Sequence, residues 1–153
     1  MMDTGKKPPK DKSQDHLPLY RLLKQKVILL VEDDPGTRKM LKMMLREANF
    51  DFVEADTGRD ALAKLSRHPE IDLALIDINM PQINGIQLIN IIRKQGEYAK
   101  IPLVVVSAMT DQKSLVQSIK AGAQDYVVKP VDKKILLEKI CKLLNLQEKA
   151  DLN

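Results

Sequence analysis

Five short aliphatic runs, separated by segments with helical periodicity, constrain the fold of this chain more than any other feature of its sequence. The intervening segments place apolar side chains three or four positions apart, as one face of a helix does. The aliphatic runs are expected to be strands, at 27–31, 51–55, 73–77, 103–107 and 125–128. The segments between and after them are expected to be helices, at 35–48, 57–65, 85–94, 111–120 and 132–144. Such alternation predicts an α/β fold, a doubly wound five-stranded parallel sheet with helices on both faces.

Turn and cap residues support these boundaries. Thr57, Asp111 and Asp132 stand where a side-chain oxygen can cap the first turn of a helix, so we expect each of them to open one. Gly122 follows the fourth helical segment and is expected to end it.

The length and composition allow one folded domain with an aliphatic core. The chain has 153 residues, of which 44% are hydrophobic and 3% aromatic, with no Trp. No apolar run approaches the ~20 residues of a membrane-spanning helix. The first residues lack the apolar stretch of a secretory signal, and the single Cys141 cannot form an internal disulfide. A reducing, cytoplasmic location is therefore expected.

The two ends of the chain differ from the domain between them. Residues 1–25 are expected to form a basic flexible arm with a short amphipathic helix at 18–24, residues 26–147 the domain, and residues 148–153 a tail. Residues 1–26 carry seven basic and three acidic side chains, whereas the rest of the chain carries 18 of each. The arm is interpreted either as a solvating tail or as an electrostatic tether to nucleic acid or an anionic membrane.

Polar side chains stand where the expected strands end. They are Glu32, Asp33 and Asp34 after the first strand, Asp77 at the end of the third, Ser107 at the end of the fourth and Lys129 after the fifth. Ligands of open parallel sheets bind outside the carboxyl ends of the strands, so these side chains are expected to converge there. Each also has an ordinary structural interpretation, and Asp34 before Pro35 is equally suited to cap a helix.

The combination of carboxylates and a lysine predicts phosphoryl-transfer chemistry. Neighbouring carboxylates raise one another's pKa unless a cation lies between them, and Mg²⁺ prefers such oxygen ligands. Asp77 follows a run that must be buried on both faces, where an unpaired carboxylate is costly. With Lys129 and Mg²⁺ neutralising the phosphoryl oxygens, Asp77 can act as a nucleophile and form an aspartyl phosphate.

Four motifs occur in order along the domain. They are Val31-Glu32-Asp33-Asp34, Asp77-Ile78-Asn79-Met80-Pro81 with Gly85, Val106-Ser107-Ala108, and the run from Ala121 through Asp125-Tyr126 to Lys129-Pro130. This ordered set resembles the CheY-like receiver domain of two-component response regulators, from Lys26 to about Leu146. The resemblance implies a flavodoxin-like fold and a stand-alone, single-domain response regulator.

The resemblance also implies a metal site around the phosphorylated residue. Asp77 is expected to be the phosphoacceptor. Mg²⁺ or Mn²⁺ is expected to be held by Asp33, Asp34, Asp77 and the backbone carbonyl of Asn79, with Asp34 as a direct ligand and Asp33 acting partly through water.

Two further pairs of residues acquire roles from the resemblance. Ser107 and Lys129 are expected to bind the phosphoryl group, and Ser107 and Tyr126 to form the switch that reports it. The peptide bond between Lys129 and Pro130 is expected to be cis. Met109, two residues after Ser107, cannot orient a hydrolytic water as an acidic or amide side chain would, so slow loss of the phosphoryl group is expected.

The implied function is signalling by protein contacts. The phosphoryl donor would be a histidine kinase or phosphotransfer protein, and the output a change of the surface made by the fourth helix, fifth strand and fifth helix. A downstream protein or a second copy would bind that surface, and no DNA-binding domain is expected. The chain would catalyse only its own phosphorylation and dephosphorylation. Alternatives are a non-phosphorylated adaptor of the same fold, and a Mg²⁺-dependent phosphohydrolase, for which Asn79 replaces the second Asp that would be needed.

Overall fold

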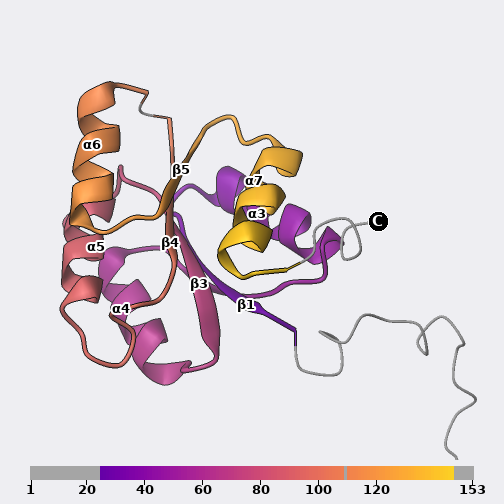
Figure 1. Ribbon diagram of the computed structural model, residues 1–153, viewed down its shortest axis with the longest axis horizontal. Coiled ribbons are helices and arrows are strands. Elements are labelled where there is room, and N and C mark those ends of the chain that lie inside the picture. The colour runs from indigo at the N-terminus through magenta and orange to yellow at the C-terminus, as the bar shows by residue number, and fades with distance from the viewer. Residues whose placement is uncertain (1–24, 109, 147–153) are drawn as a thin grey trace, which may run out of the picture.

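The computed structural model describes residues 25–108 and 110–146, and these ranges contain one parallel sheet and five helices (Figure 1). The strands are β1 (Val27–Val31), β2 (Asp51–Ala55), β3 (Ile71–Ile76), β4 (Leu103–Ser107) and β5 (Asp125–Val128). The helices are α3 (Pro35–Glu47), α4 (Gly58–Arg67), α5 (Gly85–Arg93), α6 (Gln112–Ala121) and α7 (Lys133–Leu143). The strand order is β2-β1-β3-β4-β5, and all four pairings are parallel. The predicted fold class is confirmed.

The two faces of the sheet are covered by different helices. Side chains alternate along a strand, so Ile28 and Leu30 point to one face of β1 and Leu29 and Val31 to the other. The first face packs against α3 and α7, and the second against α4 and α5, with α6 beside α5 (Figure 1). The resulting two cores are aliphatic, and the central strands β1, β3 and β4 are buried on both sides.

Each described helix begins with a side-chain cap. Thr57, Asp111 and Asp132 accept a hydrogen bond from the backbone three residues later, as expected from the sequence. Asn84 forms a reciprocal capping box with Gln87 at the start of α5. Gly122 ends α6 with a positive φ of 124°, a conformation that favours glycine.

The third strand differs from its predicted bounds. β3 begins at Ile71, two residues earlier than expected, and ends at Ile76, so that Asp77 lies just beyond the strand. The Asp72 side chain accepts a hydrogen bond from the Val27 backbone at 2.8 Å, which joins the start of β3 to the start of β1. The backbone N–H of Asp77 still donates to Val31 O at 3.0 Å, so the strand end is held beside β1.

Several expectations lie outside the described residues. These are the arm with its helix at 18–24, the tail at 148–153 and the side chain of Met109. Among the residues that are described, no helix is both long and apolar enough to cross a bilayer.

Candidate functional site

The carboxyl ends of β1 and β3 bring three carboxylates together. One oxygen each from Glu32, Asp33 and Asp77 lies within 4.8 Å of the others. Glu32 and Asp33 follow β1, and Asp77 follows the neighbouring strand β3, because the two strands pair in register up to Val31 and Ile76. Glu32 and Asp77 are buried, at 1% and 5% exposure, whereas Asp33 is partly exposed. The structure therefore confirms a carboxylate cluster at this edge of the sheet.

Lys129 supplies the positive charge of this cluster. Its Nζ lies 2.8 Å from Glu32 Oε1 and 3.6 Å from Asp77 Oδ2. Burial lowers the pKa of the Lys129 ammonium, but the hydrogen bond to Glu32 and the charge of Asp77 outweigh burial, so the pKa is raised. Lys129 is therefore charged at neutral pH and lies against the two buried carboxylates.

Glu32 has a structural role at the site that the sequence analysis did not assign. Burial raises the pKa of its carboxyl group, and its hydrogen bond with Lys129 opposes that rise in part. Its second oxygen accepts a hydrogen bond from the Asp34 N–H at 3.2 Å, and its backbone carbonyl accepts one from Arg38 Nη1 at 2.6 Å. The sequence does carry a signal for this role of Glu32. The residue directly follows a buried strand, where a carboxylate requires a partner.

The structure places Asp34, which was expected to hold the metal directly, away from the three clustered carboxylates. Asp34 lies outside the group of three carboxylates and is the N-cap of α3. Its Oδ2 accepts hydrogen bonds from the Thr37 N–H at 2.8 Å and from the Thr37 hydroxyl at 2.7 Å, which lower the pKa of Asp34. The physical reason is that α3 begins at Pro35, so the preceding side chain turns back to the open N–H groups of the helix.

The loop after β3 holds Asp77 in a fixed position. The Asn79 N–H donates to Asp77 Oδ1 at 3.3 Å, while the Asn79 side chain is exposed. Gly85, the first residue of α5, passes directly behind Asp77, and a Cβ on Gly85 would lie only 2.3 Å from Asp77 O. The backbone carbonyl of Asn79 belongs to this same short loop.

Ser107 and Tyr126 lie on the neighbouring strands β4 and β5. Ser107 ends β4 and is fully buried, and its carbonyl accepts a hydrogen bond from the Lys129 N–H at 2.9 Å. The Tyr126 ring is partly buried against the core on the α4–α5 side. Burial raises the pKa of the Tyr126 hydroxyl, and a side-chain hydrogen bond with Ser107 opposes this. The Lys129–Pro130 peptide bond, which follows β5, is cis.

The donor set suits a hard divalent cation. Asp33 and Asp77 each offer a carboxylate oxygen within 4.8 Å of the other, and Asp33 is partly exposed, so water can complete the partly hydrated coordination that Mg²⁺ prefers. Glu32, the third carboxylate of the group, forms an ion pair with Lys129. The carboxylates present therefore fit a hard divalent ion such as Mg²⁺ or Mn²⁺.

Comparison with known proteins identifies relatives of this fold and site. A family described as the response regulator receiver domain matches residues 28–141. A chemotaxis protein CheY homolog of Campylobacter jejuni is 30% identical over 114 residues, which cover 74% of this chain and 88% of that protein.

Solved structures give the same result. The chemotaxis protein CheY4 of Vibrio cholerae aligns with a TM-score of 0.73 and 27% identity, over 78% of this chain and 98% of that one. The receiver domain of a sensor histidine kinase from Pseudomonas aeruginosa, with a magnesium ion coordinated in its active-site cleft, aligns with a TM-score of 0.74 and 26% identity. That alignment covers 79% of this chain and 98% of the other.

Proposed function

Because this chain belongs to the response regulator receiver family, a family of phosphorylatable signalling domains, we propose that Asp77 accepts a phosphoryl group from a histidine kinase or phosphotransfer protein. The observation that carries the proposal is the placement of Asp77. It is buried at the carboxyl end of a central strand, within 4.8 Å of two other carboxylates and 3.6 Å from the Lys129 ammonium. The proposed location of this process is the cytoplasm.

In the proposed reaction an Asp77 carboxylate oxygen attacks the phosphorus of a phosphohistidine on the donor. The new O–P bond forms as the P–N bond breaks, and the electron pair of that bond leaves with the donor's imidazole. Lys129 holds its ammonium where the negative phosphoryl oxygens arrive, and the Ser107 hydroxyl can donate to one of them. The chain acts on its own Asp77 and is a signalling protein with no external substrate.

A divalent cation belongs to the proposed reaction. Asp33, Asp77 and the Asn79 carbonyl would hold Mg²⁺ or Mn²⁺, which when bound supplies positive charge to the phosphoryl oxygens. Glu32 keeps Lys129 in place beside Asp77, with a distance of 2.8 Å between Lys129 Nζ and Glu32 Oε1. Asp34 has no direct contact with the ion in this proposal, because its carboxylate caps α3.

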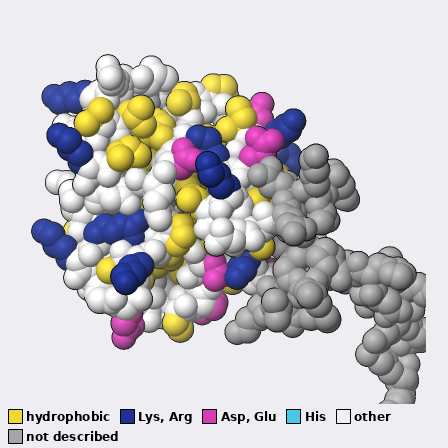
Figure 2. Space-filling model, in the orientation of Figure 1, with side chains coloured by type: hydrophobic (Ala, Val, Ile, Leu, Met, Phe, Trp, Pro, Cys, Tyr) yellow, Lys and Arg dark blue, Asp and Glu magenta, His cyan; other side chains and the backbone are white. Residues whose placement is uncertain are grey.

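The proposed output surface is the face made by α6, β5 and α7. Large apolar side chains are unusually exposed on it, and hydrophobic atoms gather over α6 in the upper left of Figure 2. They are Leu115 (41% exposed), Val116 (40%), Ile119 (46%), Val128 (44%) and Ile135 (47%). Such a patch is typical of a protein-binding surface. A downstream protein or a second copy of the chain would bind there when Ser107 and Tyr126 respond to phosphorylation of Asp77.

A non-phosphorylated adaptor would bind partners through the same fold without chemistry at Asp77. Nothing in the structure favours that alternative, because the acceptor, two acidic neighbours and the lysine converge as the reaction requires. A phosphohydrolase acting on external substrates would need a second acidic group at position 79, where this chain has Asn79.

The proposal predicts the uptake of one phosphoryl group. After incubation of the whole chain with acetyl phosphate and Mg²⁺, intact mass spectrometry should show one added phosphoryl group. Asp77→Asn should abolish this mass increase while the fold remains, because an amide keeps the shape but cannot attack phosphorus. Removal of the metal with a chelator should prevent the reaction.

Asp34→Asn is the matched control, because the amide still caps α3 and the residue lies outside the carboxylate group. It should be phosphorylated about as fast as the wild type. An unchanged mass increase in Asp77→Asn would refute the proposed acceptor, and loss of phosphorylation in Asp34→Asn would restore Asp34 as a metal ligand.

A further inference from the structure

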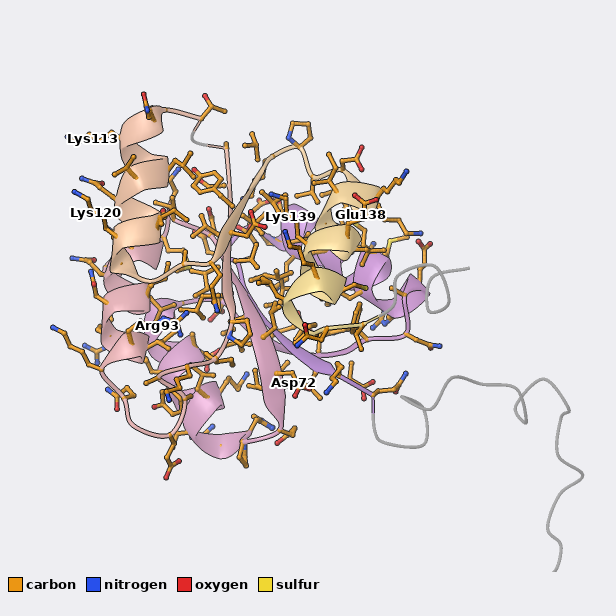
Figure 3. All side chains as sticks on the ribbon, viewed as in Figure 1. Asp72, Arg93, Lys113, Lys120, Glu138 and Lys139 are labelled. Atoms are coloured by element: carbon orange, nitrogen blue, oxygen red, sulfur yellow. The ribbon has the colours of Figure 1, made fainter. Side chains whose placement is uncertain are left out.

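A groove of about 740 Å³ lies at the amino-terminal edge of the sheet, the edge opposite Asp77. It is formed by the starts of β1 and β2, the turn that precedes β3, and the residues that follow α7. Asp72, at this edge of the sheet, marks its position in Figure 3. The groove is remote from the proposed phosphorylation site, so what binds in it does not depend on the proposed function.

Part of the lining of the groove is apolar. Leu144 and Leu146, after α7, are only partly buried, although each packs against the core on the α3–α7 side. Val27 is likewise only partly covered, and Pro69 is exposed. An occupant that covered these side chains would remove apolar surface from water.

The remainder of the groove carries a net negative charge. Among the described residues that line it, three carry carboxylates, Asp51, Glu70 and Asp72, and one, Lys26, carries an ammonium. Asp72 is held by the Val27 backbone, and Asp51 is exposed. The groove therefore suits an occupant that has both apolar and positively charged side chains.

The chain itself supplies such an occupant at the mouth of the groove. Gln25 lines the groove, and residues 17–24, with the sequence LPLYRLLK, immediately precede it. This segment has two basic residues, Arg21 and Lys24, and no acidic residue. If helical, as the sequence predicts, it places Leu19, Leu22 and Leu23 on one face.

We propose that residues 17–24 dock in this groove, with the leucines against Leu144 and Leu146 and with Arg21 and Lys24 toward the carboxylates. No linker separates the segment from the groove, so binding is intramolecular and benefits from a high effective concentration. The segment would thereby cover the apolar side chains between the start of β1 and the residues after α7.

The other end of the chain is a poorer match for the same groove. Residues 147–153 continue directly from Leu146, so they too begin at its wall. They carry Glu148 and Asp151 against Lys149, and only one leucine, Leu152. The carboxylates of the groove would repel this segment, and a single leucine covers less of the apolar lining.

Hydrogen exchange in the whole chain tests the proposal. The backbone amides of residues 19–24 should exchange at least about tenfold more slowly than those of an isolated peptide of residues 17–24. Leu22→Asp should bring them to the rate of the peptide, because the aspartate has no apolar contact and is repelled. Asp51→Lys should reduce the protection roughly two- to fivefold, as expected for the loss of a surface charge attraction.

Glu138→Lys is the matched control for Asp51→Lys. It makes the same charge change on α7, away from the groove (Figure 3), and should leave the protection of residues 19–24 unchanged. Unchanged exchange of the β1 and β3 amides in every variant would show that the domain remains folded, since Leu22 lies outside it.

Three results would overturn the proposal. The first is exchange of residues 19–24 at the peptide rate in the wild type. The second is a set of nuclear Overhauser contacts that join the methyl groups of Leu144 to Leu152 instead of Leu22, which would assign the groove to the other end of the chain. The third is protection that rises with protein concentration, which would assign it to a second copy.

Discussion

At the scale of single residues, Gly85 shows how closely the backbone is packed behind Asp77. A Cβ at this position would lie 2.3 Å from Asp77 O and 2.8 Å from Ile78 Cα, both of them backbone atoms that cannot move alone. Gly85→Ala should therefore displace the loop that carries Asp77. We expect a loss of roughly 1–3 kcal/mol in the free energy of unfolding and slower phosphorylation by acetyl phosphate. Urea unfolding and intact mass against time measure the two effects.

Gly96→Ala is the control for this substitution, because a Cβ on Gly96 would meet nothing within 4 Å. It should leave the phosphorylation rate unchanged, with a change in stability of no more than about 1 kcal/mol. Equal effects of the two substitutions would mean that the crowding behind Asp77 has no part in positioning it.

At the scale of secondary-structure elements, Arg93 joins the end of α5 to the loop that precedes β4 and to the loop that precedes β5. Its guanidinium donates to Ala99 O, Ile101 O and Gly122 O at 2.6–3.1 Å, and to Gln124 Oε1 at 3.0 Å. Arg93→Met keeps much of the apolar stem but leaves these partly buried acceptors without their donor. We expect it to lower the free energy of unfolding by roughly 2–3 kcal/mol in a urea titration.

Lys94→Met provides the comparison, since Lys94 is the exposed neighbour at the end of the same helix. Its cost should lie within about 0.5 kcal/mol of zero. A cost for Arg93→Met no larger than that of Lys94→Met would show that the hydrogen bonds of Arg93 add nothing to the stability of the fold.

At the scale of the whole molecule, the question is how a change at Asp77 reaches the face of α6, β5 and α7. We propose Ser107 as the connecting residue, because it ends β4 and its side chain interacts with that of Tyr126 on β5. Beryllofluoride with Mg²⁺, an analogue of the phosphoryl group, should shift amide NMR signals along these three elements. Ser107→Ala should uncouple that shift from binding of the analogue.

Ser118→Ala removes another buried hydroxyl, one that bonds only within α6 to Ser114 O at 2.8 Å, and should preserve the shift along β5 and α7. Shifts confined to the loops around Asp77, with Tyr126 unchanged, would contradict an output through this face. The slow loss of the phosphoryl group expected from Met109 stays a prediction, because that residue lies outside the described ranges.

The sequence by itself determined the order of the elements and the residue at the centre of the site. β1, β2, β4 and β5 have the predicted bounds, because strands in a covered parallel sheet must be short and apolar, and because caps such as Thr57 and Asp111 act on their own helix. Asp77 was identifiable for the same local reason, since a carboxylate directly after a buried strand requires a partner.

Only the tertiary structure decided which two of three consecutive acids enter the carboxylate cluster. Glu32, Asp33 and Asp34 are all acidic and follow the same strand, so the sequence does not distinguish their roles. In the structure Asp34 caps α3, which begins at Pro35, while Glu32 forms an ion pair with Lys129 from the other end of the domain. The partners of Arg93 and the walls of the groove beside Leu146 were likewise hidden, because they join segments far apart in the chain. Local patterns determine local hydrogen bonds, whereas contacts between distant segments exist only once the sheet has brought them together.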